Sequence, residues 1–393
     1  MQMLEGVIRN YQWGSVTTLP EFCGRPKDGE PWAELWLGAH RSSPSQLGGS
    51  GHTLAEAIES DGAGQLGTHP VERFGELPFM MKVLAVAAPL SLQVHPDQTD
   101  AKAGFAREEQ AGIAIDAFER SFKDPNHKPE MVCALTDFDA LYGFRSVAET
   151  LGVLNGLQIE SLAPVRALLS DNPNDGGVRA AITFLLGLDL DSARSLVADV
   201  VESCRRYGDG PYLDVASMAL TLAEHYPNDG GVGIALLMNL VHLKPGQAVF
   251  VSPTTLHAYL CGTAVEVLAN SDNVVRGGLT PKHVDAQTLL DVASFEPVSV
   301  AVQEPAAVNG VATFDSPVEE FCVQRLDIDS EHQGPQEFGD GPAIVLCVDG
   351  VADLGELTLD RGDAAWVAAN DAACSITGRA TLYVASLGEP ARS

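Results

Sequence analysis

The segment Lys244-Pro-Gly-Gln-Ala-Val-Phe-Val-Ser-Pro-Thr-Thr-Leu-His-Ala-Tyr259 joins a Pro-Gly turn, an apolar run, a second proline and a histidine. A short apolar run bounded by Pro and Gly is typical of a β-strand. His257 stands among apolar neighbours, where a core histidine bonded to backbone is the default interpretation. On a strand, Tyr259 would leave the same face as His257. The segment therefore predicts a strand, a turn and then a strand that begins near His257.

The same strand-like texture recurs on both sides of a central helical stretch. The runs alternate with Gly and Pro in a way that favours a β-sandwich or jelly roll over a parallel α/β sheet. Besides the segment above, we expect strands at Phe79–Val86, Leu90–Val94, Ala264–Leu268, Val298–Val302, Ala343–Val348 and Ala365–Ala368.

Residues 146–240 have a helical pattern instead. Ser146 followed by Glu149 has the order of a capping box. Within the stretch, Pro173-Asn-Asp-Gly-Gly-Val178 recurs as Pro227-Asn-Asp-Gly-Gly-Val232, which predicts two similar helix-to-helix connections. Amphipathic helices are expected at Ala180–Leu188, Ser192–Tyr207 and Leu213–His225.

Strands, then helices, then strands predict a mainly β fold with an inserted helical domain. We divide the chain into a first jelly-roll domain (1–145 plus 241–290), an inserted helical domain (146–240) and a C-terminal jelly-roll domain (291–393). The C-terminal part repeats the turn-then-strand shape at Leu359–Ala369, but Asn370-Asp-Ala-Ala-Cys374 follows without a histidine. We therefore expect no metal site in that domain.

Charge and composition argue against several classes of protein. With 53 acidic and 24 basic side chains, the formal net charge is −29, which disfavours nucleic acids and membrane surfaces as ligands. Every apolar run is too short for a spanning helix. Met1-Gln-Met-Leu-Glu-Gly6 lacks the basic-then-apolar build of a signal peptide, and the seven cysteines are scattered singly. We expect a cytoplasmic protein with reduced thiols.

Three further segments contain residues suited to chemistry. In Leu90-Ser-Leu-Gln-Val-His-Pro-Asp97, Gln93 and His95 would share one face of a strand and could bind a divalent ion, although a surface pair is the commoner outcome. Asp124-Pro-Asn-His-Lys-Pro-Glu-Met131 is a rigid polar loop. Glu266–His283 combines turn formers with cations, as in a phosphate-binding loop or an ordinary exposed turn.

Together these segments resemble the type I phosphomannose isomerase family. Asn10-Tyr-Gln-Trp-Gly-Ser15, Trp32-Ala-Glu-Leu-Trp-Leu-Gly-Ala-His40 and Leu77-Pro-Phe-Met-Met-Lys-Val-Leu84 extend the resemblance, and the motifs occur in the family's order from residue 10 to about 285. Beyond about 290 only the architecture is similar. The resemblance implies a zinc enzyme built from cupin-type jelly rolls with inserted helices.

The resemblance also implies a ligand set and a reaction. Carried over residue by residue, the ligands of one zinc ion per chain fall on Gln93, His95, Glu130 and His257. These imidazole, carboxylate and amide donors include no thiolate, so the ion would keep its Lewis acidity. The implied reaction is reversible conversion of mannose 6-phosphate to fructose 6-phosphate through an enediolate. Trp13 and Glu34 match family motif positions, and we expect them to serve packing.

Several residues are candidates for proton transfer and substrate binding. Arg276 is implied as an active-site residue, and the general base remains open among Lys128, Glu266, Asp272 and His127. His127 could equally contact substrate. The remaining expected substrate-binding residues are Ser91, Lys82, Lys282 and Tyr259, with Ser91 and Lys282 assigned to the phosphate.

Two other functions compete with the isomerase. One is another metal-dependent cupin enzyme, such as an iron oxygenase, which would leave the cationic loop without a purpose. The other is a catalytically silent module that binds sugar phosphates. In each case the partner is a small molecule, and the amphipathic character of the inserted helices favours a monomer.

Overall fold

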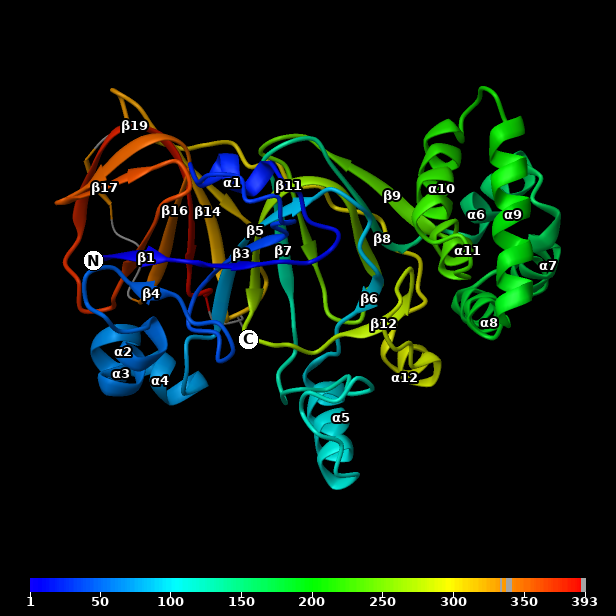
Figure 1. Cartoon of the computed structure of the whole chain (residues 1–393), viewed down its shortest axis with the longest axis horizontal. Helices are drawn as coiled ribbons and strands as arrows, with labels where there is room; N and C mark the ends of the chain where they lie inside the picture. Colours follow the sequence, from blue (N-terminus) through cyan, green and yellow to red (C-terminus); the bar gives the residue numbers. More distant parts are fainter. Residues whose placement is uncertain (333, 337–340, 390–393) are drawn as a thin grey trace.

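The computed structural model describes residues 1–332, 334–336 and 341–389, and two antiparallel β-sheets form its body (Figure 1). In these residues one sheet has nine strands in the order β13-β14-β19-β16-β18-β1-β4, with β15 beside β19 and β17 beside β16. Its strands are β1 (Gln2–Glu5), β4 (Gln46–Leu47), β13 (Val311–Phe314), β14 (Cys322–Ile328), β15 (Gly334–Gln336), β16 (Ala343–Leu354), β17 (Leu357–Asp360), β18 (Ala364–Val367) and β19 (Cys374–Ser386).

The second sheet has ten strands in the described chain and is organised around one long strand, β11 (His257–Ala269). Near its beginning β11 pairs with β6 and β8, and towards its end it pairs with β5 and β7. A single strand therefore connects β6 and β8 with β5 and β7. The others are β2 (Val7–Arg9), β3 (Glu34–Leu37), β5 (Phe79–Val86), β6 (Leu92–Val94), β7 (Glu130–Ala134), β8 (Phe138–Phe144), β9 (Met238–Leu243), β10 (Ala248–Val251) and β12 (Val275–Gly278).

The two sheets share one apolar core. Met131 and Val265 of the second sheet belong to the same buried cluster as Ile344 and Trp366 of the first. Burying such side chains contributes about 1.5–3 kcal/mol each. This core holds β5, β7 and β11 rigidly, and these strands carry much of the candidate site.

Helices α6 to α11 follow one another between β8 and β9 and lie beside the second sheet (Figure 1). They pack on it through a second apolar cluster that includes Phe144 and Val275. The three amphipathic helices are confirmed, as are both Pro-Asn-Asp-Gly-Gly-Val connections, whose last residues form the first turns of α8 and α11. The bounds are α6 (Val147–Leu157), α7 (Ala163–Asp171), α8 (Asp175–Leu186), α9 (Leu190–Arg206), α10 (Leu213–His225) and α11 (Gly231–Ala235).

The first 145 residues contain short helices that the strand-like texture did not predict. One signal was available, because Thr53 and Glu56 form a capping box at the beginning of α2. Across the described residues, no helix is both long and apolar enough to cross a membrane. The remaining helices are α1 (Thr18–Phe22), α2 (Leu54–Ser60), α3 (Gly62–Leu66), α4 (Thr68–Phe74), α5 (Gln98–Gln110) and α12 (Ala286–Val292).

The predicted strand at Val298–Val302 is wrong. Val298 and Val300 do pack against the core, so the alternating pattern is real. However, the backbone there forms only isolated bridges, from Pro297 to Phe144 and from Gln303 to Ala248. The alternation reflects an extended segment with one face on the core, without a ladder of hydrogen bonds.

Candidate active site

Strand β6 places its glutamine between two other predicted site residues. Gln93 is paired with His257 of β11 on one side and with Arg276 of β12 on the other. Paired residues on neighbouring antiparallel strands project from the same face of a sheet. Three residues that are far apart in the sequence therefore meet on one face.

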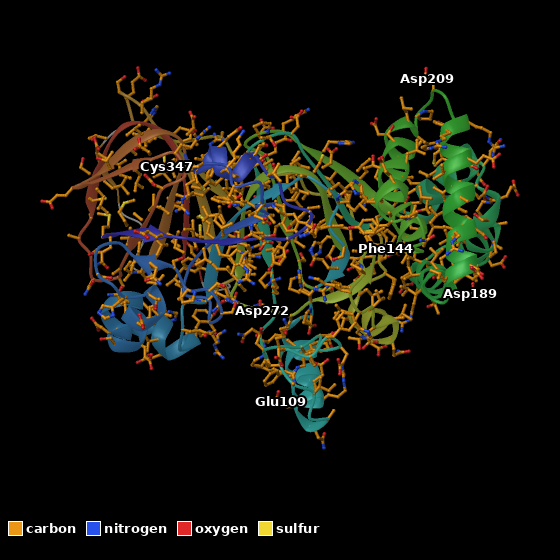
Figure 2. The ribbon with its side chains drawn as sticks, viewed as in Figure 1. Glu109, Phe144, Asp189, Asp209, Asp272 and Cys347 are labelled. Atoms are coloured by element: carbon orange, nitrogen blue, oxygen red, sulfur yellow. The ribbon has the colours of Figure 1, made fainter. Side chains whose placement is uncertain are left out.

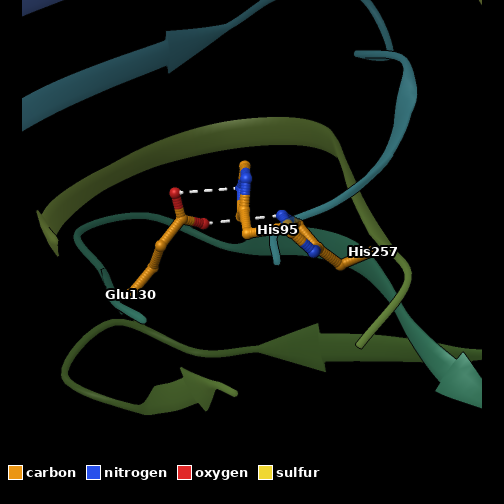
Figure 3. Close-up of side chains that lie close together, drawn as sticks. All are labelled: His95, Glu130 and His257. Atoms are coloured by element: carbon orange, nitrogen blue, oxygen red, sulfur yellow. Dashed lines mark ion pairs between the residues drawn. The ribbon is translucent and has the colours of Figure 1, made fainter. Parts of the chain in front are cut away.

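Two histidines and a glutamate form a tight cluster next to Gln93. His95 Nε2 lies 3.3 Å from Glu130 Oε1, and His257 Nε2 lies 3.4 Å from Glu130 Oε2. All the ligand atoms of the three residues lie within 4.8 Å of one another. Figure 3 shows both imidazoles directed at the Glu130 carboxylate. We therefore treat these residues as a candidate metal centre.

The hydrogen bonds of the two imidazoles fit a metal centre. His95 Nδ1 donates to Asn273 O at 2.7 Å, and His257 Nδ1 donates to Thr255 O at 3.0 Å. A donating Nδ1 leaves the Nε2 lone pair free for a metal ion. Both Nε2 atoms are buried and have no hydrogen-bond partner among the described residues. An ion at this point would satisfy two buried acceptors that are otherwise costly.

A buried ion pair lies beside this cluster. Lys82 of β5 faces Glu266 of β11, and Lys82 Nζ lies 3.1 Å from Glu266 Oε2. Burial alone would lower the pKa of Lys82, but the carboxylates around it, above all Glu266, raise it above its ordinary value. Burial also raises the pKa of Glu266, and the Lys82 ammonium opposes this rise. The pair combines a permanent cation with a carboxylate suited to accept a proton.

A cleft of about 960 Å³ opens over these groups. A cleft of this size can enclose a small phosphorylated molecule. It brings together ten of the predicted residues, which are Lys82, Ser91, Gln93, Lys128, Glu130, Tyr259, Glu266, Asp272, Arg276 and Lys282. Trp13 and Glu34, which we expected to serve packing, line it as well.

One end of the cleft gathers cations. Arg276, Lys282 and Lys123 all line it, and within the described residues no carboxylate forms an ion pair with any of them. Partial burial and the charges of Arg276 and Lys123 lower the pKa of Lys282. Unpaired cations are unexpected in a chain with 53 acidic side chains, so this end of the cleft suits an anion.

Two of the candidate bases are distinguished by the groups around them, and one of these two lies outside the cleft. His127 Nε2 lies 2.7 Å from Glu320 Oε1 and is not among the residues that line the cleft. Asp272, which is labelled near the centre of the view in Figure 2, lines the cleft and contacts His40 Nε2 at 3.2 Å. Burial would raise the pKa of Asp272, but His40 and the nearby lysines lower it to about 2. Its carboxylate is therefore a weak base.

Sequence reasoning missed two contributors to the cleft. Lys123 immediately precedes the Asp124–Met131 loop and carries no motif signal of its own. Helix α10 and the turn after it contribute His225, Tyr226 and Asp229. The only sequence signal for this turn was the repeated Pro-Asn-Asp-Gly-Gly-Val, which equally describes a copy that does not line the cleft.

Comparison with known proteins gives one consistent result. A family model described as phosphomannose isomerase type I, catalytic domain, matches residues 1–147. The mannose-6-phosphate isomerase of Escherichia coli (strain K12) is 38% identical, over 97% of this chain and 98% of that protein. The chain belongs to the type I phosphomannose isomerase family. A relative from Rattus norvegicus, also a mannose-6-phosphate isomerase, is 31% identical over 94% of this chain and 93% of its own length.

Solved structures of the family agree with this assignment. A crystal structure of mannose 6-phosphate isomerase bound with zinc and yttrium has a TM-score of 0.91 and 36% identity, covering 98% of this chain and 99% of that one. A zinc-bound holo structure of mannose 6-phosphate isomerase has a TM-score of 0.90 at 36% identity, with the same coverage. Zinc, the metal in these structures, is commonly bound by histidine and carboxylate ligands such as those of the candidate centre of this chain.

Proposed function

We propose that this chain is an aldose–ketose isomerase that interconverts mannose 6-phosphate and fructose 6-phosphate. One observation carries the proposal. Gln93 lies between His257 of the candidate metal centre and Arg276 of the cationic end. A sugar whose C1 and C2 oxygens lie near the metal centre could thus extend its phosphate towards unpaired cations in the same cleft.

We propose one zinc ion per chain, held by Gln93, His95, Glu130 and His257. The two orphaned Nε2 atoms and the Glu130 carboxylate support this set. When bound, zinc polarises oxygens and stabilises the negative charge that develops on them.

Glu266 is our choice for the proton carrier. Its carboxylate is buried, lines the cleft and has a pKa that burial raises, which brings it closer to the range that suits a base. It would take the C2 proton of the open-chain aldose and return it to C1. Lys82, at 3.1 Å, would balance the charge of the carboxylate before the transfer. Lys128 lines the cleft as the alternative carrier, whereas Asp272 lines it as a weak base with a lowered pKa.

We propose that the phosphate of the substrate binds at the cationic end of the cleft. We assign Arg276 and Lys282 to it, together with Ser91, and we add Lys123 because its ammonium shares this end of the cleft. Arginine and lysine both suit phosphate, and arginine can bind it through two parallel hydrogen bonds. Tyr259, whose hydroxyl lies 3.5 Å from Glu130 Oε2, would line the sugar site.

The finer architecture is also part of the proposal. We infer cupin-type jelly rolls for 1–145 plus 241–290 and for 291–393, with 146–240 as an inserted helical domain and with β1 and β4 joining the sheet of the C-terminal part. The position of α6 to α11 between β8 and β9 supports the insertion. We further propose a cytoplasmic monomer whose partner is a small sugar phosphate, since the charge of −29 disfavours nucleic acids and membranes.

A coupled assay for fructose 6-phosphate tests the function. The purified chain is assayed as isolated, after treatment with a chelator and after zinc is returned. We expect activity, loss of activity and recovery, in that order. Full turnover in verified metal-free protein would contradict the metal role. Binding of mannose 6-phosphate without conversion would instead support the silent binding module.

A further inference from the structure

The turn between α10 and α11 contacts both walls of the cleft. Tyr226 donates a hydrogen bond from its hydroxyl to Pro89 O at 2.6 Å, in the segment that leads from β5 to Ser91. Asp229 Oδ2 accepts a hydrogen bond from Thr280 N at 3.1 Å, in the segment that leads from β12 to Lys282. The helical part of the chain is thereby connected to both segments that we assign to phosphate.

Asp229 uses both oxygens of its carboxylate. While Oδ2 accepts from Thr280, Oδ1 accepts from Gly231 N at 2.7 Å, at the beginning of α11. The side chain of Thr280 in turn accepts a hydrogen bond from Lys282 N at 3.1 Å. A continuous set of hydrogen bonds therefore runs from the first turn of α11 through Asp229 to the backbone of Lys282.

The backbone that Asp229 holds is tightly packed and strained. A Cβ atom added to Gly231 would lie 2.8 Å from Leu279 N, so the chain segments approach each other at backbone distance. Gly278 and Leu279 have φ angles of +126° and +54°. A leucine with a positive φ is strained, and this conformation persists only when its surroundings fix it. Asp229 supplies part of that fixation.

We propose that Asp229 is a positioning residue for the anion-binding segment from Gly278 to Lys282. The proposal rests on the function assigned above, because it concerns how the cleft grips the phosphate. Asp229 holds the segment in the strained conformation that keeps Lys282 in the cleft beside Arg276. Its effect is geometric, since its two oxygens are occupied by backbone N–H groups.

The first copy of the repeated hexapeptide offers an internal control. In Pro173–Val178 the equivalent aspartate, Asp175, is exposed and makes no side-chain hydrogen bond or ion pair to the described residues. The turn there is fixed by Asn174, whose side chain accepts from Gly176 N at 2.9 Å. The same six residues thus form two helix connections. Only the second copy contacts the segment from Gly278 to Lys282, so only that copy has the positioning role.

The main test compares Asp229→Ala with Asp175→Ala. In Asp229→Ala the KM for mannose 6-phosphate should rise about tenfold or more, the effect of losing about 1.4 kcal/mol of ground-state binding, whereas kcat stays within about threefold. The Kd for inorganic phosphate, measured by calorimetry on the zinc-loaded protein, should rise by a similar factor. Asp175→Ala should leave both constants unchanged. A merely structural role would lower kcat and zinc content without this selective change.

Asp229→Asn is the control for a folding defect in Asp229→Ala. It keeps the volume of the side chain and one carbonyl oxygen, so it should retain one of the two backbone hydrogen bonds and give an intermediate KM. An unchanged KM and phosphate Kd in Asp229→Asn and in any soluble Asp229→Ala would overturn the proposal. So would a fall in kcat at constant KM.

The two proposals fail in different ways. A wild-type chain that binds inorganic phosphate but does not isomerise mannose 6-phosphate overturns the proposed function, while the effect of Asp229 on the phosphate Kd remains measurable. A wild-type chain that isomerises the sugar but has the same phosphate Kd as Asp229→Ala overturns only the positioning role. Absence of phosphate binding in the active wild type would also overturn it.

Discussion

The ammonium of Lys82 lies 3.1 Å from the carboxylate of Glu266, and the two side chains are only 10% and 4% exposed. They face each other across the neighbouring strands β5 and β11 of the second sheet. Two charges removed from water this completely are tolerated because each compensates the other. The pair is thus a structural element as well as a part of the proposed catalytic site.

Removing only the Lys82 ammonium should destabilise the fold. In Lys82→Met the Glu266 carboxylate would remain buried without its partner, and the free energy of unfolding should fall by about 3 kcal/mol. Urea denaturation measures this change, and the isomerase assay should show a large loss of activity. The double variant Lys82→Met with Glu266→Gln should recover part of the stability but none of the activity.

An exposed pair serves as the control for this prediction. Lys244 Nζ lies 3.2 Å from Asp137 Oδ2, but the side chains are 67% and 74% exposed. Lys244→Met should therefore change the free energy of unfolding by less than about 1 kcal/mol. If Lys82→Met is no more destabilising than Lys244→Met, the pair is not the buried, mutually compensated unit described above.

The candidate metal centre predicts a clear contrast between two histidines. His257→Ala should reduce bound zinc from about one ion per chain to a small fraction, and isomerase activity should fall with it, because one of the few protein ligands is lost. His242 is the matched control, since it pairs with Asp139 at 2.7 Å and is 48% exposed. Metal analysis and the coupled assay check both variants.

The measured zinc content also tests whether the C-terminal part of the chain has a metal site. Wild-type protein should contain one ion, and His257→Ala close to none, if 291–393 has no metal site of its own. Zinc retained in His257→Ala at the wild-type level would contradict the proposed ligand set. Loss of zinc in His242→Ala would show that the assay reports general destabilisation.

Local sequence signals account for much of this fold. Hydrophobic runs bounded by Gly and Pro located strands such as Phe79–Val86, and amphipathic periodicity located α9 and α10. Periodicity reports which face is buried, but not whether the backbone has a neighbour to pair with. For that reason Val298–Val302 resembles a strand in sequence and forms only isolated bridges.

The candidate site depends more on long-range contacts. The family motifs located ten residues that line one cleft. No motif indicated that His127 would pair with Glu320, which is 193 positions away. Likewise, two identical hexapeptides could not reveal that Asp229 would meet Thr280 while Asp175 remains exposed. Such differences arise from tertiary packing, which local sequence does not encode.

The cationic end of the cleft predicts a local effect of charge on substrate binding. Arg276→Ala or Lys282→Ala should raise the KM for mannose 6-phosphate about 10- to 100-fold, since a hydrogen bond between charged groups contributes about 1.5–3 kcal/mol. Lys123→Ala should also raise KM, but less, because Lys123 is exposed. Steady-state kinetics at fixed ionic strength measure all three.

A distant carboxylate provides the comparison that decides this point. Glu202 is 71% exposed and lies in the last turns of α9, and neither it nor its ion-pair partner Arg206 lines the cleft. Salt screens charges that are separated by more than about 10 Å at 0.1 M, so Glu202→Gln should leave KM unchanged although it reduces the net negative charge. If Glu202→Gln lowers KM by as large a factor as Arg276→Ala raises it, the overall field governs substrate binding. An unchanged KM in Glu202→Gln means that a small set of unpaired cations suffices for an anionic ligand in a protein with a net charge of −29.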